Sequence, residues 1–139
     1  MENGLKLNNQ EKELLLKDLC SRLPYKVKIQ CINSDNETVI EELFTIGIEE
    51  DTFDCNLIEY VAVKPYLLPL SSMTEEQLYN NPVGFSQMLT IKADRDWENI
   101  TINRRDYYKL VDWFNKNHFD YRGLIEKGLA IDATGLNIY

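Results

Sequence analysis

The amino-acid sequence predicts an α+β fold, in which a small antiparallel β-meander or a partly closed barrel is covered by amphipathic helices. Alternating and β-branched apolar residues over 25–63 indicate strands. Capped segments with helical periodicity flank this region. A length of 139 residues with 44% hydrophobic residues fits a single domain, 1–139, in which residues 1–7 are expected to fray.

The first predicted element is an amphipathic helix over residues 9–22. Asn8 supplies an N-cap, and Glu11 stands in capping-box position. Leu15 and Leu19 follow at helical spacing and are expected to face the core. The helix should end before Pro24, because a residue that precedes proline is disfavoured in the α region.

Three strands are predicted next, over residues 25–33, 38–48 and 55–63. The first alternates cleanly between apolar and polar residues, and turn-forming residues separate it from the second. Gly47 marks a bulge or bend within the second strand. Because the links are short, the three strands are expected to pair as a meander.

Residues 64–74 are predicted to form an extended crossover between two halves of the chain. Pro65 and Pro69 fix φ at about −65° and remove two backbone donors. A central strand and an ordinary helix interior are therefore both excluded for this segment.

Two helices and one further strand are predicted after the crossover. Thr74 and Gln77 form a capping box for a short helix, and residues 87–92 are interpreted as a strand that extends the sheet. Residues 94–96 are expected to form a solvated loop. Asn103 caps a helix over residues 104–117, which is expected to lie over the sheet. Its apolar stripe consists of Tyr107, Leu110, Val111 and Phe114.

The net charge of −8 is concentrated in the first half of the chain. Residues 1–63 hold 6 basic and 13 acidic side chains, a net charge of −7, whereas residues 64–139 hold 9 and 10, a net charge of −1. Such a surface repels a phosphate backbone and suits a basic protein partner better than nucleic acid. Nine acids and no Lys or Arg occur between residues 35 and 59: Asp35, Glu37, Glu41, Glu42, Glu49, Glu50, Asp51, Asp54 and Glu59.

The sequence favours a cytoplasmic protein without membrane association. No apolar run approaches the roughly 20 residues of a membrane helix, and the first residues do not resemble a signal peptide. Cys20, Cys31 and Cys55 are odd in number and form no CxxC pair, so each is interpreted as a small, buried apolar residue.

Two segments resemble a family of short uncharacterised proteins encoded by gut bacteria and their phages or mobile elements. The segments are residues 64–74, KPYLLPLSSMT, and residues 112–125, DWFNKNHFDYRGLI. The resemblance implies an accessory or phage-related protein inside a bacterial cell. It brings with it no catalytic or binding residues.

The sequence contains no recognised catalytic or cofactor motif. GxGxxG, P-loop, HExxH and GxSxG patterns are all missing, and the acidic run 49–54 lacks the ligand spacing of an EF-hand. His118 is the single histidine, and nothing in the spacing assembles it with Ser71 or Ser72 into a nucleophilic site. We therefore expect a non-enzymatic protein without cofactor or metal, in which His118 caps a helix or packs between aromatic rings.

Aromatic and basic residues interleave over residues 104–122. Such a pattern fits core packing with solvated cations, a protein-binding surface, or stacking on single-stranded nucleic acid. Arg122 is expected to pair with Asp112 or Asp120 or to serve a ligand. The predicted function is binding of another macromolecule, a protein in preference to single-stranded nucleic acid. The candidate binding residues are Arg104, Arg105, Tyr108, Trp113, His118, Tyr121 and Arg122.

Overall fold

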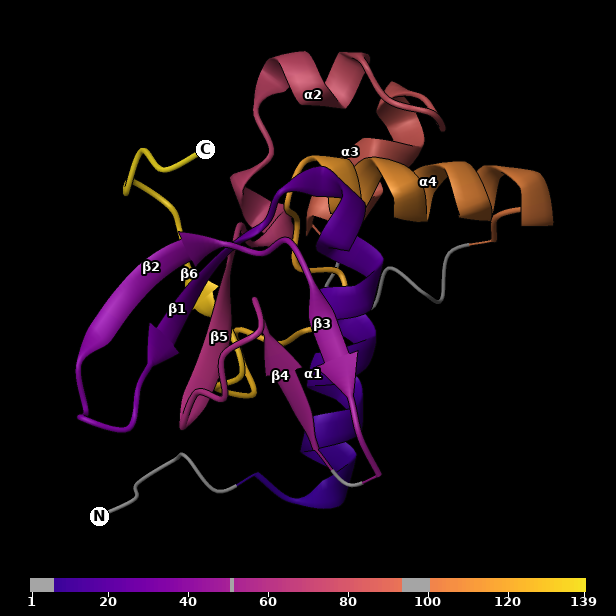
Figure 1. The fold of residues 1–139 in the computed structure, drawn as a ribbon. Helices are drawn as coiled ribbons and strands as arrows, with labels where there is room; N and C mark the ends of the chain where they lie inside the picture. Colours follow the sequence, from indigo (N-terminus) through magenta and orange to yellow (C-terminus); the bar gives the residue numbers. More distant parts are fainter. Residues whose placement is uncertain (1–6, 51, 94–100) are drawn as a thin grey trace.

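The computed structural model describes residues 7–50, 52–93 and 101–139, and it confirms an α+β fold (Figure 1). Of the residues 1–7 that were expected to fray, the structure describes Leu7, which is partly buried against the core, so the prediction is wrong for that residue. Residues 1–6 and the expected loop at 94–96 lie outside the described residues. In chain order the elements are α1 (Asn9–Arg22), η2 (Leu23–Tyr25), β1 (Lys28–Ile32), β2 (Thr38–Glu42), β3 (Ile46–Ile48), β4 (Phe53–Cys55), β5 (Ala62–Leu67), η3 (Leu70–Ser72), α2 (Glu75–Tyr79), α3 (Phe85–Ala93), α4 (Arg104–Lys116) and β6 (Ile131–Asp132).

The strands form two sheets. The larger sheet has the order β2-β1-β5-β6; β1 pairs antiparallel with β2 and β5, whereas β5 pairs parallel with β6. A separate two-stranded sheet consists of β3 and β4. Within the described residues neither sheet closes into a barrel.

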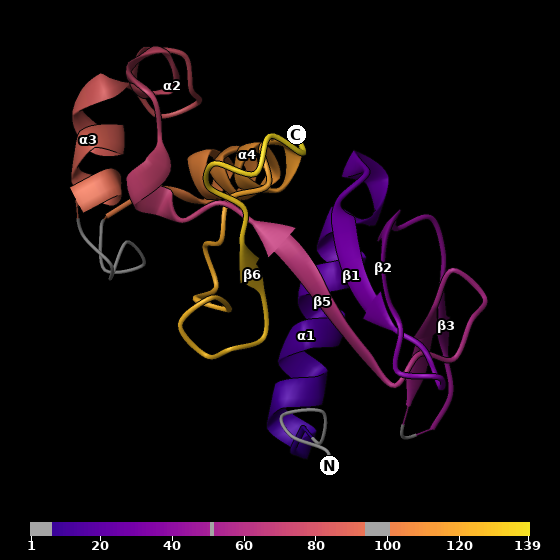
Figure 2. The same cartoon turned by 90° about the vertical axis from the view of Figure 1, so that its left-hand side faces the viewer.

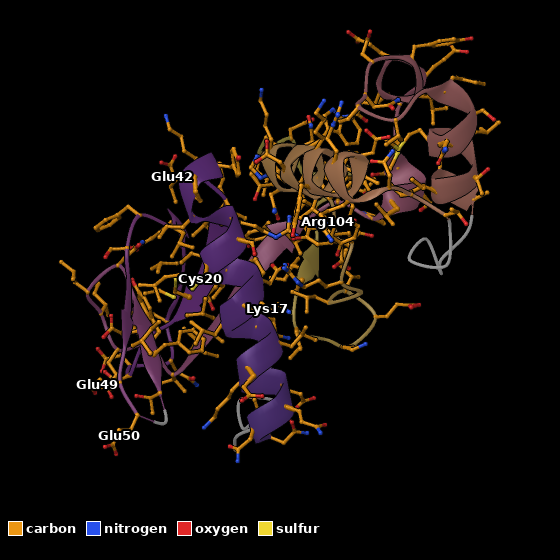
Figure 3. All side chains as sticks on the ribbon, turned by 90° about the vertical axis from the view of Figure 1, so that its right-hand side faces the viewer. Lys17, Cys20, Glu42, Glu49, Glu50 and Arg104 are labelled. Atoms are coloured by element: carbon orange, nitrogen blue, oxygen red, sulfur yellow. The ribbon has the colours of Figure 1, made fainter. Side chains whose placement is uncertain are left out.

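The helix α1 covers one face of the larger sheet. It lies in front of the strands in Figure 3 and behind them in Figure 2. Leu15 and Leu19 of α1 meet Ile29, Cys31 and Leu67 of the strands in one buried cluster. The apolar side chains that alternate along β1 thus face this helix.

The predicted helix starts are confirmed. Asn8 Oδ1 accepts from Glu11 N at 2.8 Å, and Glu11 Oε1 accepts from Asn8 N at 3.0 Å, which completes the capping box of α1. Thr74 and Gln77 form the same box at α2. Asn103 Oδ1 accepts from Asp106 N at 2.9 Å at the start of α4.

A second buried cluster lies among α2, α3 and α4, which gather above the sheet in Figure 1. Leu110 and Phe114 of α4 pack there with Met88 and Ile91 of α3 and with Phe119. The prediction that helix 104–117 covers the sheet is therefore wrong. Leu110 and Phe114 of its apolar stripe are buried mainly against other helices, because α1 already occupies that face of the sheet. Tyr107 of the same stripe is 40% exposed.

The prediction of a strand over residues 87–92 is also wrong, because these residues belong to α3. Met88 and Ile91 are both fully buried and lie three residues apart. A strand would place them on opposite faces, whereas a helix brings them to the same face. Burial of that face in the second cluster therefore favours the helix.

The predicted boundaries of the second and third strands change as well. Residues 38–48 divide into β2 and β3, which belong to different sheets. Residues 55–63 are not one strand, because the chain turns at Asn56 and Leu57 before it enters β5 at Ala62.

Residues 64–67 of the predicted crossover belong to β5, an internal strand of the larger sheet, so the exclusion of a central strand is wrong. Pro65 lies opposite Ile29 of β1. On the other side β6 pairs with Tyr66 and Leu67, one residue further along. At Pro65 the strand therefore has a paired neighbour on one side, as at a sheet edge, where a missing donor is tolerated.

Candidate interaction surface

The structure distributes the seven candidate binding residues over three environments. Arg104, Arg105 and Tyr108 lie on the exposed face of α4, where Tyr108 is 66% exposed. Trp113 is half-buried and stacks on Phe119, with ring centroids 5.6 Å apart. The other three, His118, Tyr121 and Arg122, belong to the segment that follows α4.

A buried ion cluster holds this segment against α1. Asp18 and Arg22, both fully buried, form a bidentate pair with N–O distances of 2.8 and 3.0 Å. Arg22 Nη2 also donates to Phe119 O at 2.8 Å, and Arg122 Nη1 donates to Asp18 Oδ1 at 2.9 Å. Both guanidinium groups lie over the ring of Tyr121, at 5.3 and 4.6 Å from its centroid.

Arg122 thus pairs with a carboxylate from the other half of the chain, and the expected pairing with Asp112 or Asp120 is wrong. Those two carboxylates are engaged elsewhere. Asp120 accepts from Leu124 N at 2.8 Å and from Ile125 N, while burial raises its pKa. Asp112 accepts from the hydroxyl of Tyr25. The cluster around Arg122 therefore joins two parts of the fold.

His118 is packed rather than placed beside a nucleophile. Its ring stacks on Tyr139 with centroids 3.6 Å apart, and burial, reinforced by the charge of Arg22, lowers its pKa to about 4. The imidazole is therefore neutral at pH 7. Ser72 Oγ donates instead to Pro69 O at 2.7 Å.

The two buried thiols carry no sign of activation. Cys31 and Cys55 are buried, and burial raises their pKa values to about 11 and about 12, which disfavours the thiolate. Cys20 is exposed on α1 (Figure 3), so its expected burial is wrong. The described residues contain no group of three His, Cys, Asp or Glu side chains that could hold a metal ion.

The acidic half of the chain presents an apolar surface that the sequence analysis missed. Leu57 is 78% exposed and Phe44 is 63% exposed, and Ile58 is exposed beside them. Glu42 and Glu59 are also exposed and stand within two residues of these apolar side chains. We call Glu42, Phe44, Leu57, Ile58 and Glu59 the Leu57 surface. Figure 3 shows further acids, Glu49 and Glu50, at the far end of β3, away from Arg104.

Asn56 holds the Leu57 surface together through its side chain. Its Oδ1 accepts from Phe44 N at 2.8 Å and from Thr45 N at 3.3 Å. Its Nδ2 donates to Glu41 Oε1 and to Glu42 O, both at 3.0 Å. Because Asn56 is only 5% exposed, these hydrogen bonds fix the β2–β3 connection against the turn that carries Leu57.

The turn itself is strained at Leu57. Ile58 N donates to Cys55 O at 3.1 Å, and the two central residues, Asn56 and Leu57, have φ values of 56° and 65°. Asparagine tolerates this left-handed conformation, whereas for leucine it costs about 1–2 kcal/mol. The fold therefore bears a conformational cost to present a solvent-exposed leucine, a combination typical of functional positions.

Comparisons with known proteins add little to this geometry. No protein-family model matches the chain, and no solved structure matches it. Among curated proteins, the sodium/myo-inositol cotransporter of Mus musculus is 30% identical over 117 residues, which cover 75% of this chain. The chain spans 16% of the length of that relative. Within the described residues, every helix is too short or too polar to cross a bilayer.

Proposed function

We propose that this protein is a non-enzymatic binding protein and that its partner is a protein with a basic and apolar segment that docks on the Leu57 surface. One observation carries the proposal: a strained, 78% exposed leucine stands in a fixed turn within a stretch of nine acids and no cations. The family resemblance of residues 64–74 and 112–125 would make it an accessory protein of a phage or mobile element.

The chemistry of the surface selects the partner. Phe44, Leu57 and Ile58 offer apolar area whose removal from water favours association. Glu42 and Glu59 flank them and would attract Lys or Arg side chains, which speeds encounter and selects against acidic partners. Because Asn56 already orders the backbone, binding would not bear the entropy of fixing the turn.

Single-stranded nucleic acid is the second candidate, and the exposed Arg104, Arg105 and Tyr108 on α4 favour it. Tyr121 and Arg122 support it less, because they belong to the buried ion cluster. A titration of an oligonucleotide at low and high salt tests this alternative. Absence of binding at low ionic strength rules it out.

Matched peptides test the leading proposal. A peptide of alternating Leu and Lys is compared with one of equal length made of Leu and Glu, and with a Ser and Lys peptide that has the charge alone. We expect the Leu and Lys peptide to bind, the Leu and Glu peptide not to bind, and the Ser and Lys peptide to bind more weakly. Higher salt should weaken the interaction, because exposed charges contribute to it.

Two pairs of variants locate the binding site. Glu42→Gln with Glu59→Gln should weaken binding, and so should Phe44→Ser with Ile58→Ser. The control, Glu75→Gln with Glu76→Gln on α2, removes the same charge far along the chain and should leave the affinity unchanged. Equal affinity of all variants for the Leu and Lys peptide, or no binding at all, would contradict the proposal.

A further inference from the structure

A pocket of about 490 Å³ lies between α1 and the strands β4 and β5. Its volume is within the range of small-molecule sites, about 300–1,000 Å³. Apolar side chains from distant parts of the chain form much of its lining: Leu15, Phe53, Val61, Val63 and Leu129. The pocket thus combines the apolar character and the size that a small apolar ligand requires.

The charged side chains that line the pocket are mostly cationic. Lys12 and Lys64 line it together with one carboxylate, Glu59. Within residues 7–50, 52–93 and 101–139, neither lysine forms an ion pair. Tyr60 also lines the pocket, and burial, reinforced by Glu41, raises the pKa of its hydroxyl. Among the described residues that line the pocket, the net charge is therefore plus one, although the whole chain is net negative by eight.

We propose that this pocket binds a small apolar monocarboxylate of the medium-chain fatty acid type. The hydrocarbon tail would lie among Leu15, Phe53, Val63 and Leu129, where it loses contact with water. The carboxylate would meet the ammonium groups of Lys12 and Lys64 in charge-assisted hydrogen bonds. Glu59 disfavours a second negative charge on the ligand, which is why a monocarboxylate fits better than a dicarboxylate.

Three ligands with the same ten-carbon chain separate the contributions of the tail and the charge. Decanoate, decanol and decylammonium are titrated below their micellar concentrations and followed by calorimetry. We expect decanoate to bind about tenfold more tightly than decanol, a factor that corresponds to about 1.4 kcal/mol. Decylammonium should bind most weakly, because it meets two like charges.

Lysine variants then locate the charge effect. Lys12→Met with Lys64→Met should reduce the affinity for decanoate about tenfold and leave that for decanol unchanged. The control, Lys17→Met with Lys109→Met, removes two exposed lysines outside the pocket lining and should bind decanoate like the parent protein. Methyl NMR signals of Leu15 and Val63 should shift when decanoate is added.

Several results would overturn the proposal. They are the absence of binding, equal affinities for decanoate and decanol, tighter binding of decylammonium, and a pocket variant that behaves like its control. Methyl shifts confined to Leu57 and Ile58 would also overturn it, because they would assign the ligand to the Leu57 surface.

Discussion

Two regions of the molecule, the aromatic cluster around Phe114 and the Leu57 surface, treat their large apolar side chains in opposite ways. In the C-terminal half, Phe114 and Phe119 are fully buried and meet edge to face, with centroids 6.4 Å apart, although cations are interleaved with them in the sequence. In the acidic half, Phe44 and Leu57 face the solvent. Charge along the sequence is therefore a poor guide to the exposure of apolar side chains, which depends on the element that lies opposite them.

The segment after α4 is joined to β5 by backbone hydrogen bonds and to α1 by side chains. Leu68 N donates to His118 O, and Asp120 N donates to Leu68 O, both at 2.8 Å, directly beyond the end of β5. Asp18 adds the buried ion cluster from α1. The segment after α4 is therefore held by both β5 and α1.

The largest expected effect comes from breaking this junction. Asp18→Ala leaves the buried Arg22 without its carboxylate and should lower the free energy of unfolding by about 3–5 kcal/mol. Chemical denaturation measures the loss. Replacing both partners, Asp18→Leu with Arg22→Met, should cost much less, because no buried charge is left unpaired. A single variant as stable as the double variant would contradict this account of the junction.

A smaller, local effect is expected at the Leu57 surface. Aspartate in Asn56→Asp still tolerates the left-handed φ and still offers acceptors to Phe44 N and Thr45 N. The variant loses the two hydrogen bonds donated to Glu41 and Glu42, and it adds a negative charge beside Glu41. We expect a loss of about 1–3 kcal/mol in the free energy of unfolding. Hydrogen exchange should show faster exchange at Phe44 and Thr45 than in the parent protein, with α4 unaffected.

The pH dependence of stability sharpens the description of the junction. Because the pKa of His118 in the folded protein, about 4, lies below its usual value of 6.5, the unfolded chain takes up the proton first as the pH falls. The contribution of His118 to the free energy of unfolding is therefore fully present above pH 6.5 and is lost as the pH falls toward 4. Asp120, whose pKa is raised, acts in the opposite direction.

His118→Asn isolates the histidine, because asparagine does not titrate and tolerates the φ of 63° found there. As the pH is lowered from 7 to 4, the melting temperature should fall less steeply for the variant than for the parent protein. Parallel melting profiles of the two proteins would show that the histidine is not buried as described.

The elements with strong local signals could be predicted from the sequence. Asn8, Thr74 and Asn103 cap helices as their spacing indicates, because capping depends on residues within one turn. The segment containing Met88 and Ile91 was predicted as a strand, because a short apolar run has no decisive period and the facing cluster decides.

The candidate site was harder to predict for the same reason. Arg122 finds Asp18, which is 104 residues away, and no local pattern announces such a pair. At Asn56 a signal was present, since asparagine is one of the few residues that tolerate a positive φ. A turn at Asn56 would correctly have separated β4 from β5. Nothing in the local sequence, however, indicates that Leu57 also adopts a positive φ.

Leu57→Gly tests the central claim most directly, because it separates stability from binding. Glycine relieves the left-handed strain but makes the unfolded chain more flexible, so we expect the free energy of unfolding to rise by about 0.5–1 kcal/mol. The same variant should bind the Leu and Lys peptide at least about tenfold more weakly, because the exposed apolar anchor is gone. A variant that gains stability and keeps its affinity would show that Leu57 is not an interaction residue.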